Sequence, residues 1–166
     1  MKFLGMKDNI IFATMRIQNF IDVIEEWAPT AYAEDFDNVG LIIGNPELEC
    51  KGVLVTHDTL ENVVEECIKK DFNLIVSFHP IIFSGLKKLT QSTYVERVVT
   101  KAIKNDICVY AIHTALDNHR FGVSHALAES LGLSDIEVLS PKEKTDLKLN
   151  VVGKIPEILL DNTDRN

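Results

Sequence analysis

Cysteine is scarce in this chain. The 166 residues include three cysteines, Cys50, Cys67 and Cys108, which are widely spaced and form no C-x-x-C pair. An odd number of distant cysteines excludes a regular disulfide framework and offers no zinc-finger spacing. We therefore expect a reducing compartment and a cytoplasmic location.

Positive charge is also in short supply. The chain has 17 Lys and Arg residues against 25 Asp and Glu residues, a net charge of -8, and Lys87-Lys88 is the only compact basic pair in an expected loop. Nucleic-acid surfaces need clustered cations that displace counterions from phosphates. The composition therefore predicts no nucleic-acid partner.

Long apolar runs and the common nucleotide-binding motifs are missing as well. The apolar stretch at Ile10-Ile11-Phe12 is too short for an export signal core or a membrane span, so we expect no membrane partner. We expect residues 1–14 to be an extension outside the fold. The sequence contains no Walker A motif, no dinucleotide Gly motif and no G-x-S-x-G, so nothing supports ATP, NAD or serine-hydrolase chemistry.

Apolar strands and amphipathic helices alternate along the rest of the chain. Continuous apolar runs at 53–56, 74–77 and 107–112 are typical of buried strands. Between them, apolar residues recur at helical spacing over 60–68 and 95–103. This alternation predicts an α/β fold with a mainly parallel sheet flanked by helices, because right-handed βαβ crossovers produce that arrangement.

Further elements are expected on both sides of this unit. An amphipathic pattern predicts a helix over 17–27, and an apolar run predicts a strand over 39–43 before the turn signal Gly44-Asn45-Pro46. Towards the C-terminus, we expect a helix over 123–131 that is ended by Gly132.

The C-terminal part of the chain is expected to contain an edge strand. After Ile136-Glu137-Val138-Leu139 comes an alternating run over 147–151 that suggests this strand. We expect the α/β domain to span 15–156 and residues 157–166 to be a truncated or disordered tail.

Two of the expected strands end on candidate metal ligands. His79 follows the strand at 74–77, and His113 and Asp117 follow the strand at 107–112. Ligands of open α/β sheets bind in the crevice beyond the carboxyl ends of the strands. Zinc, manganese and iron accept imidazole and carboxylate donors, so a divalent metal site is expected there. For His113 and Asp117 to face one point, we expect a conformation other than a helix.

The metal candidates also have structural explanations. His79 alone could be a hydrogen-bonded histidine at a strand end, and Asp117 could serve a turn. Asp37 is most simply a turn residue, although its carboxylate could face the same crevice.

The pair His57-Asp58 looks on paper like a nucleophile-activating pair. We expect Asp58 instead to be the N-cap of the helix that follows, because Glu61 stands three residues later as its capping partner.

Four ordered motifs together resemble the NIF-three-like family, whose members often carry the name GTP cyclohydrolase I type 2 homologue. The resemblance extends over about residues 15–156. The motifs are Glu34-Asp35-Phe36-Asp37-Asn38-Val39-Gly40-Leu41-Ile42-Ile43-Gly44, Val55-Thr56-His57-Asp58-Thr59, Ser77-Phe78-His79-Pro80-Ile81-Ile82-Phe83 and His113-Thr114-Ala115-Leu116-Asp117.

The resemblance implies a fold of two related halves, of which this chain corresponds to the N-terminal half and the start of the second. It also implies a homohexamer with a dinuclear metal site. The family's ligands include the His-His-Pro histidines and the aspartate that ends His-Thr-x-x-Asp. By position, these motifs make His79 and Asp117 metal ligands in this chain.

Two departures from the family pattern change the expected chemistry. Phe78 stands where the family has the first histidine, and the C-terminal His and Glu ligands have no counterpart in the sequence. His113 and Asp37 are then the additional or ligand-orienting candidates. We expect a divalent-metal-binding protein with a metal-dependent hydrolase role on a nucleotide-like or other small substrate. The alternatives are a non-catalytic interaction or regulatory protein and an inactive fragment.

Overall fold

The computed structural model describes residues 15–141 and 148–154. The extension expected at 1–14 and the tail expected at 157–166 lie outside these described residues. Within the described part of the chain, no helix is both long and apolar enough to cross a membrane.

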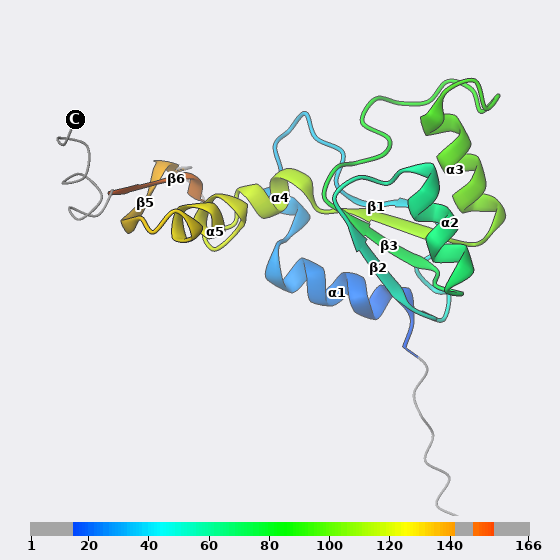
Figure 1. Cartoon of the computed structure of the whole chain (residues 1–166), viewed down its shortest axis with the longest axis horizontal. Helices are drawn as coiled ribbons and strands as arrows, with labels where there is room; N and C mark the ends of the chain where they lie inside the picture. The colour runs from blue at the N-terminus through cyan, green and yellow to red at the C-terminus, as the bar shows by residue number, and fades with distance from the viewer. Residues whose placement is uncertain (1–14, 142–147, 155–166) are drawn as a thin grey trace, which may run out of the picture.

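A four-stranded sheet forms the centre of the fold (Figure 1). Its strands are β1 (Gly40–Ile43), β2 (Val53–Thr56), β3 (Leu74–Ser77) and β4 (Cys108–Ala111), in the order β1-β4-β3-β2. The strands β2, β3 and β4 are mutually parallel, whereas β1 runs antiparallel to β4. The prediction of a mainly parallel sheet is confirmed.

Helices cover both faces of this sheet, which explains why its strands are mostly apolar on both faces. α2 (Glu61–Lys69) and α3 (Tyr94–Lys104) pack on one face, and α1 (Ile17–Trp27) packs on the other. Neighbouring residues of a strand point to opposite faces. Thus Ile75 joins the core under α2 and α3, while Leu74 joins the core under α1.

The turn after β1 needs glycine. Gly44 has φ +106°, and a Cβ atom there would lie 2.8 Å from Cα of Cys108. Real Cβ atoms do not approach a backbone so closely, so the Gly44-Asn45-Pro46 turn depends on the missing side chain.

After the sheet, the described residues form two helices and a pair of antiparallel strands. After β4 come α4 (His113–Asp117) and α5 (Val123–Ser130), with Gly132 following at φ +68°. An antiparallel pair, β5 (Ser134–Pro141) and β6 (Lys148–Lys154), lies beyond α5 (Figure 1). The strand predicted from the alternating run at 147–151 corresponds to β6. The expectation that 113–117 would not be helical is wrong.

The predicted cap of α2 is also wrong. Leu60 occupies the N-cap position without a side-chain hydrogen bond, and the carboxylate of Asp58 contacts two histidines instead. Spacing to Glu61 satisfied the capping rule locally, but the neighbouring strand end supplies Asp58 with stronger partners.

α3, in contrast, begins with a complete set of caps. Thr93 accepts a hydrogen bond from the N–H of Glu96, and the buried Glu96 carboxylate accepts from Thr90 and Ser92. The hydrogen bonds from Thr90 and Ser92 lower the pKa of Glu96 to about 2. This carboxylate orders the loop before α3.

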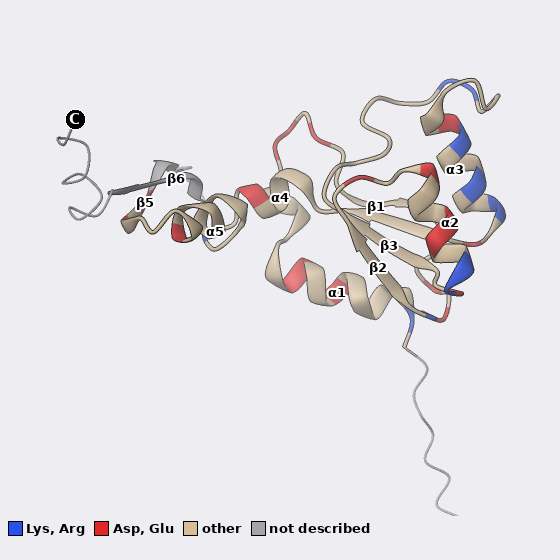
Figure 2. Cartoon of the chain, in the orientation of Figure 1, with Lys and Arg blue, Asp and Glu red and all other residues tan. Residues whose placement is uncertain are grey.

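Basic side chains lie along α3 and at the end of α2 (Figure 2). Arg97 and Lys101 of α3 pair with Glu61 and Glu65 of α2 at 2.8 and 2.7 Å. These ion pairs join the two helices on the outer face of the protein, where each pair adds little stability.

Candidate metal centre

Three histidines lie at the carboxyl ends of three adjacent strands, and we call them the histidine row (His57, His79 and His113). The N–H of His79 donates to the carbonyl of His57 at 3.0 Å, and the N–H of His113 donates to the carbonyl of Phe78 at 3.0 Å. The hydrogen-bond ladder of the sheet therefore continues past the ends of the strands. Because adjacent strands lie about 4.8 Å apart, the ladder sets the spacing of the imidazoles.

The rings of the histidine row are close enough to act together. The ring centroids of His57 and His79 are 4.4 Å apart, and those of His79 and His113 are 5.4 Å apart. Two imidazoles that bind one zinc ion place their nitrogens about 2.0–2.1 Å from it, which requires rings at about this separation.

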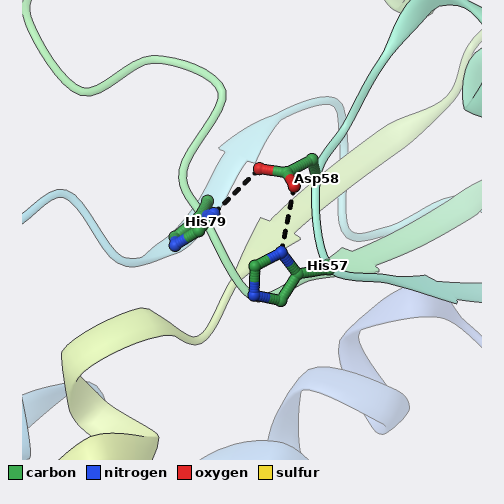
Figure 3. A group of neighbouring side chains, drawn as sticks. All are labelled: His57, Asp58 and His79. Atoms are coloured by element: carbon green, nitrogen blue, oxygen red, sulfur yellow. Dashed lines mark hydrogen bonds and ion pairs between the residues drawn. The ribbon is translucent and has the colours of Figure 1, made fainter.

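Asp58 holds two members of the row at once (Figure 3). One carboxylate oxygen accepts from Nδ1 of His79 at 2.8 Å, and the other accepts from Nδ1 of His57 at 2.9 Å. The hydrogen bonds from His79 and His57 lower the pKa of Asp58. An ionised carboxylate only accepts hydrogen bonds, so both rings donate to Asp58 from Nδ1, and Nε2 is the ring nitrogen that this hydrogen bonding leaves available.

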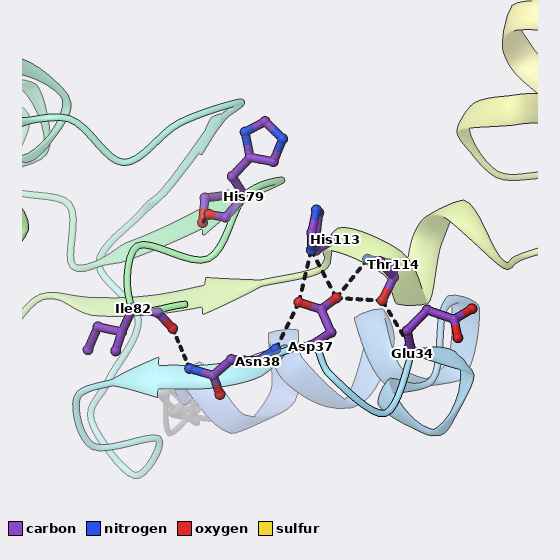
Figure 4. A network of polar contacts seen from close by, with 8 residues as sticks. Glu34, Asp37, Asn38, His79, Ile82, His113 and Thr114 are labelled. Carbon is purple, nitrogen blue, oxygen red and sulfur yellow. Dashed lines mark hydrogen bonds and ion pairs between the residues drawn. The ribbon is translucent and has the colours of Figure 1, made fainter. Parts of the chain in front are cut away.

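Asp37 holds the third member, His113 (Figure 4). Its side chain is fully buried, and it accepts from Nδ1 of His113 at 2.9 Å, from the N–H of Asn38 at 2.8 Å and from the N–H and hydroxyl of Thr114. Burial raises the pKa of Asp37, but the hydrogen bonds from Thr114 and His113 outweigh burial and lower it. Asp37 is thus a turn residue that also orients a histidine.

Asp117 lies one helical turn after His113, so the two side chains share a face of α4. No described residue donates a hydrogen bond to its half-buried carboxylate. Burial raises the pKa of Asp117, the charges of His113 and His79 oppose this rise, and the charge of Asp37 adds to it. The predicted ligands Asp117 and His79 therefore lie within electrostatic reach of each other.

The backbone at His113 is strained. Its φ is +23°, in a region that residues with a side chain rarely adopt and that costs on the order of 1–3 kcal/mol. The ladder bond to Phe78 and the bond to Asp37 hold this conformation. Strain of this kind, retained next to polar side chains, is frequent at binding sites.

Phe78 forms the apolar floor of the row. Its ring stacks on His57 at a centroid distance of 5.3 Å and meets His113 edge-on at 5.5 Å. Phe78, which the sequence comparison predicted to replace a metal donor, therefore lies in the middle of the cluster.

The cluster has the donor set of a divalent-metal site. Donor atoms of His57, Asp58 and His79 all lie within 4.8 Å of one another. Two imidazoles and a carboxylate are common ligands of zinc, iron and manganese. The residues present are thus compatible with a divalent ion.

Sequence reasoning missed the part that His57 and Asp58 play in this cluster. The feature that could have identified them was the parallel strand at 53–56, which ends beside the strand that leads to His79. Aligning the two strand ends would have placed His57 next to His79, but strand order is not visible in a single sequence.

Comparison with known proteins gives a consistent family. The Duf34/NIF3 (NGG1p interacting factor 3) family model matches residues 15–162. A GTP cyclohydrolase 1 type 2 homolog of Bacillus subtilis is 44% identical over 131 residues, which cover 79% of this chain and 35% of that protein. A protein of the same name from Clostridium acetobutylicum is 32% identical over 145 residues, which cover 87% of this chain and 54% of that protein.

A solved structure agrees with the sequence matches. The Bacillus cereus protein related to NIF3 aligns with a TM-score of 0.74 at 37% identity and covers 78% of this chain and 35% of its own. The chain thus spans about a third to a half of the length of these relatives.

Proposed function

The chain belongs to the Duf34/NIF3 family, and we propose that it binds a divalent metal ion through His79 and Asp117, with His113 as the third donor. Zinc, manganese and iron suit this donor set of two imidazoles and one carboxylate. Asp58 would orient the ring of His79, and Asp37 would orient the ring of His113, each by accepting a hydrogen bond from Nδ1.

The observation that carries this proposal is the contrast between the atoms of the cluster that have hydrogen-bond partners and those that have none. Nδ1 of His79 and of His113 is held by a carboxylate, which is how metal-binding histidines are usually oriented. The Nε2 atoms have no hydrogen-bond partner among the described residues, and neither has the half-buried carboxylate of Asp117. These are the groups that an ion would satisfy.

The chemistry proposed for this site is hydrolysis of a nucleotide-like or other small substrate. A divalent ion with an open position lowers the pKa of a bound water and polarises the bond under attack. His79, His113 and Asp117 would hold the ion, and Asp58 and Asp37 would accept from Nδ1 of the two rings, so that Nε2 is the nitrogen available to the ion. Phe78 would exclude water from one side of the cluster.

Metal content tests the binding proposal. Purified full-length chain is stripped with a chelator, dialysed against Zn²⁺ and assayed by elemental analysis. We expect the wild type to bind zinc and both Asp117→Asn and His79→Ala to lose it, because each change removes a donor. His125→Ala is the matched control, since His125 lies on α5 and pairs with Glu129. Equal zinc content in the wild type and Asp117→Asn would contradict the proposal.

Hydrolysis is tested separately on a panel of nucleotides with Zn²⁺, Mn²⁺ and Fe²⁺. Metal-stimulated turnover that Asp117→Asn abolishes supports a hydrolase. Metal binding without turnover of any member of the panel would favour the second candidate function.

That second candidate is an interaction or regulatory protein that retains the family scaffold. The observation that favours it is Phe78, which places an apolar ring without donor atoms in the middle of the histidine row. In this case His79→Ala lowers metal content but leaves partner binding and assembly unchanged. The loss of both would contradict it.

We also propose that the chain forms a homo-oligomer, as the family resemblance implies, with a hexamer as the specific expectation. Light scattering during size-exclusion chromatography measures the mass directly. A monomer at all concentrations would contradict this proposal for the chain.

A further inference from the structure

A cavity between α2 and α3 is lined by three basic side chains, although the chain as a whole has a net charge of -8. These side chains are Arg97, Lys101 and Lys104, and they belong to the basic stretch that runs along α3 (Figure 2). We propose that this cavity binds a small phosphate monoester, with the phosphate group held by the three basic side chains.

The spacing of the basic residues along α3 brings them to one side of the helix. Arg97, Lys101 and Lys104 stand at positions i, i+4 and i+7, which lie above one another on a helix surface. Among the described residues that line the cavity, Glu61 of α2 is the one carboxylate. The lining therefore has an excess of positive charge, which an anion neutralises.

Hydrogen-bond donors remain available on all three basic residues. Lys104 makes no hydrogen bond or ion pair with any described residue. Arg97 donates from Nε to Glu61 at 2.8 Å and from Nη1 to the carbonyl of Gln91 at a long 3.4 Å, and its guanidinium has further N–H groups. Lys101 donates to Glu65 and has further ammonium protons. A phosphate group accepts such charge-assisted hydrogen bonds well.

Thr100 adds a hydroxyl without a hydrogen-bond partner. The residue belongs to the same side of α3 and lines the cavity. Its Oγ1 is buried and makes no hydrogen bond with any described residue, whereas buried hydroxyls are almost always paired. Rotation about χ1 exchanges the hydroxyl and methyl positions of a threonine, and two rotamers are common in helices. Because this rotation breaks no hydrogen bond, the hydroxyl can turn to a phosphate oxygen.

The cavity has room and polar groups for more than a bare phosphate. Its volume of about 210 Å³ is below the about 300–1,000 Å³ of pockets for drug-sized ligands, so it suits a small molecule. The amide side chains of Gln91 and Asn105 also line it. Nδ2 of Asn105 donates to the carbonyl of Lys101, which leaves the amide oxygen to accept from a ligand hydroxyl. A short phosphorylated polyol or sugar has both kinds of group.

This cavity is separate from the candidate metal centre. Lys104 and Asn105 stand where α3 leads into the start of β4, whereas the histidine row lies beyond the carboxyl ends of the strands (Figure 1). The residues that line the cavity include no proposed metal ligand and neither of the carboxylates that orient them. The proposal therefore goes beyond the proposed function and does not depend on it.

Calorimetric titration of the purified full-length chain tests the proposal. The protein is first treated with a chelator, so that no metal ion attracts phosphate. At about 0.15 M salt, where separated surface charges are largely screened, we expect ribose 5-phosphate to bind, inorganic phosphate to bind more weakly and ribose not to bind measurably. Absence of ribose 5-phosphate binding would overturn the proposal. Equal affinity for inorganic phosphate would overturn the assignment to a monoester.

Variants of the cavity should change the affinity for ribose 5-phosphate in opposite directions. Lys104→Ala should weaken binding about 10-fold, and Thr100→Val should weaken it about 2–10-fold, because each removes a donor to the phosphate. Glu61→Gln should strengthen binding about 2–5-fold, because it removes the opposing charge. A general effect of structure would not give opposite signs.

Lys88→Ala is the matched control, because it removes one positive charge from the loop before α3 at a residue that does not line the cavity. We expect it to bind ribose 5-phosphate like the wild type. Equal losses in Lys88→Ala and Lys104→Ala would overturn the proposal, since they would show attraction to net charge alone.

Nuclear magnetic resonance locates the ligand. Titration of the ¹⁵N-labelled chain with ribose 5-phosphate should shift the amide signals of Glu61 and of residues 97–105 and leave those of the histidine row in place. Shifts confined to the histidine row would overturn the site at α3. The zinc content of Lys104→Ala should equal that of the wild type, so failure of this proposal is distinguishable from failure of the metal site.

Discussion

Asp37 and Asp117 both interact with His113, but their carboxylates have opposite surroundings. Asp37, in the loop before β1, is fully buried and accepts hydrogen bonds from the backbone, a hydroxyl and an imidazole. Asp117, at the end of α4, is half-buried and receives none from the described residues. Accordingly, the pKa of Asp37 is lowered and that of Asp117 is raised.

This difference indicates which of the two carboxylates has a structural role and which is available to bind a ligand. A carboxylate whose hydrogen-bonding capacity is filled stabilises the fold and positions its neighbours. A carboxylate left without partners in a half-buried place costs stability unless a ligand pairs with it. Asp37 is therefore expected to matter for folding, and Asp117 for binding.

The largest expected effect is stabilisation by metal. Free Zn²⁺ at about 100 times its Kd should raise the free energy of unfolding of the wild type by about 2.7 kcal/mol. Asp117→Asn should remove this increase. Asp37→Asn should retain it, but only at zinc concentrations about 10–100-fold higher, because the ring of His113 loses its orientation.

Urea unfolding with and without zinc measures this linkage. Equal stabilisation of the variants with and without the Asp117 carboxylate would contradict the role of Asp117 as a ligand.

A smaller effect is expected in the metal-free protein. Asp37→Asn should lower the free energy of unfolding by about 1–3 kcal/mol, because an amide cannot accept from all the donors now gathered on the carboxylate. Asp117→Asn should change it by no more than about 0.5 kcal/mol, the range of substitutions that break no contact. Urea midpoints at neutral pH give the ranking, and the reverse order would refute the comparison.

The smallest effect is the dependence of stability on acid. The folded pKa of Asp37 is lowered, so its contribution is present above the unfolded value of 3.8 and is lost as the pH falls through the folded pKa. The folded pKa of Asp117 is raised, so its contribution is present below 3.8 and is lost as the pH rises through the folded pKa. The two carboxylates therefore oppose each other.

Unfolding of metal-free variants at about pH 7 and about pH 4 tests these signs. Compared with the wild type, Asp37→Asn should lose less stability on acidification and Asp117→Asn should lose more. Glu96, whose pKa is lowered to about 2, adds a loss common to all three proteins. Identical acid profiles would show that neither aspartate is perturbed by its surroundings.

Periodicity in the sequence was sufficient for most of the fold. The helices at 17–27 and 95–103 and the strands at 53–56 and 74–77 were predicted close to their observed bounds, because each has a regular apolar pattern. The antiparallel direction of β1 was not predictable, since an apolar run carries no information on direction. α4 was missed because five residues are too few to show a helical period.

The candidate site was harder to predict than the fold. His79 and Asp117 came from motif resemblance, and the structure brings them within electrostatic reach. Asp58 was assigned to a helix cap because its spacing to Glu61 fits that local rule equally well. Its actual partners lie on its immediate neighbour and on a segment 21 residues away, and only strand order brings that segment close.

The continuation of the sheet ladder past the strand ends also limits how this cluster can vary. Because main-chain bonds fix the backbones of residues 57, 79 and 113, replacing a side chain there changes which donor is present but not where it starts. Adjacent strands of the sheet lie about 4.8 Å apart, and this spacing sets the distance between the side chains at their ends. Replacing a metal-binding side chain can therefore change which ion binds, while the spacing of the backbone stays the same.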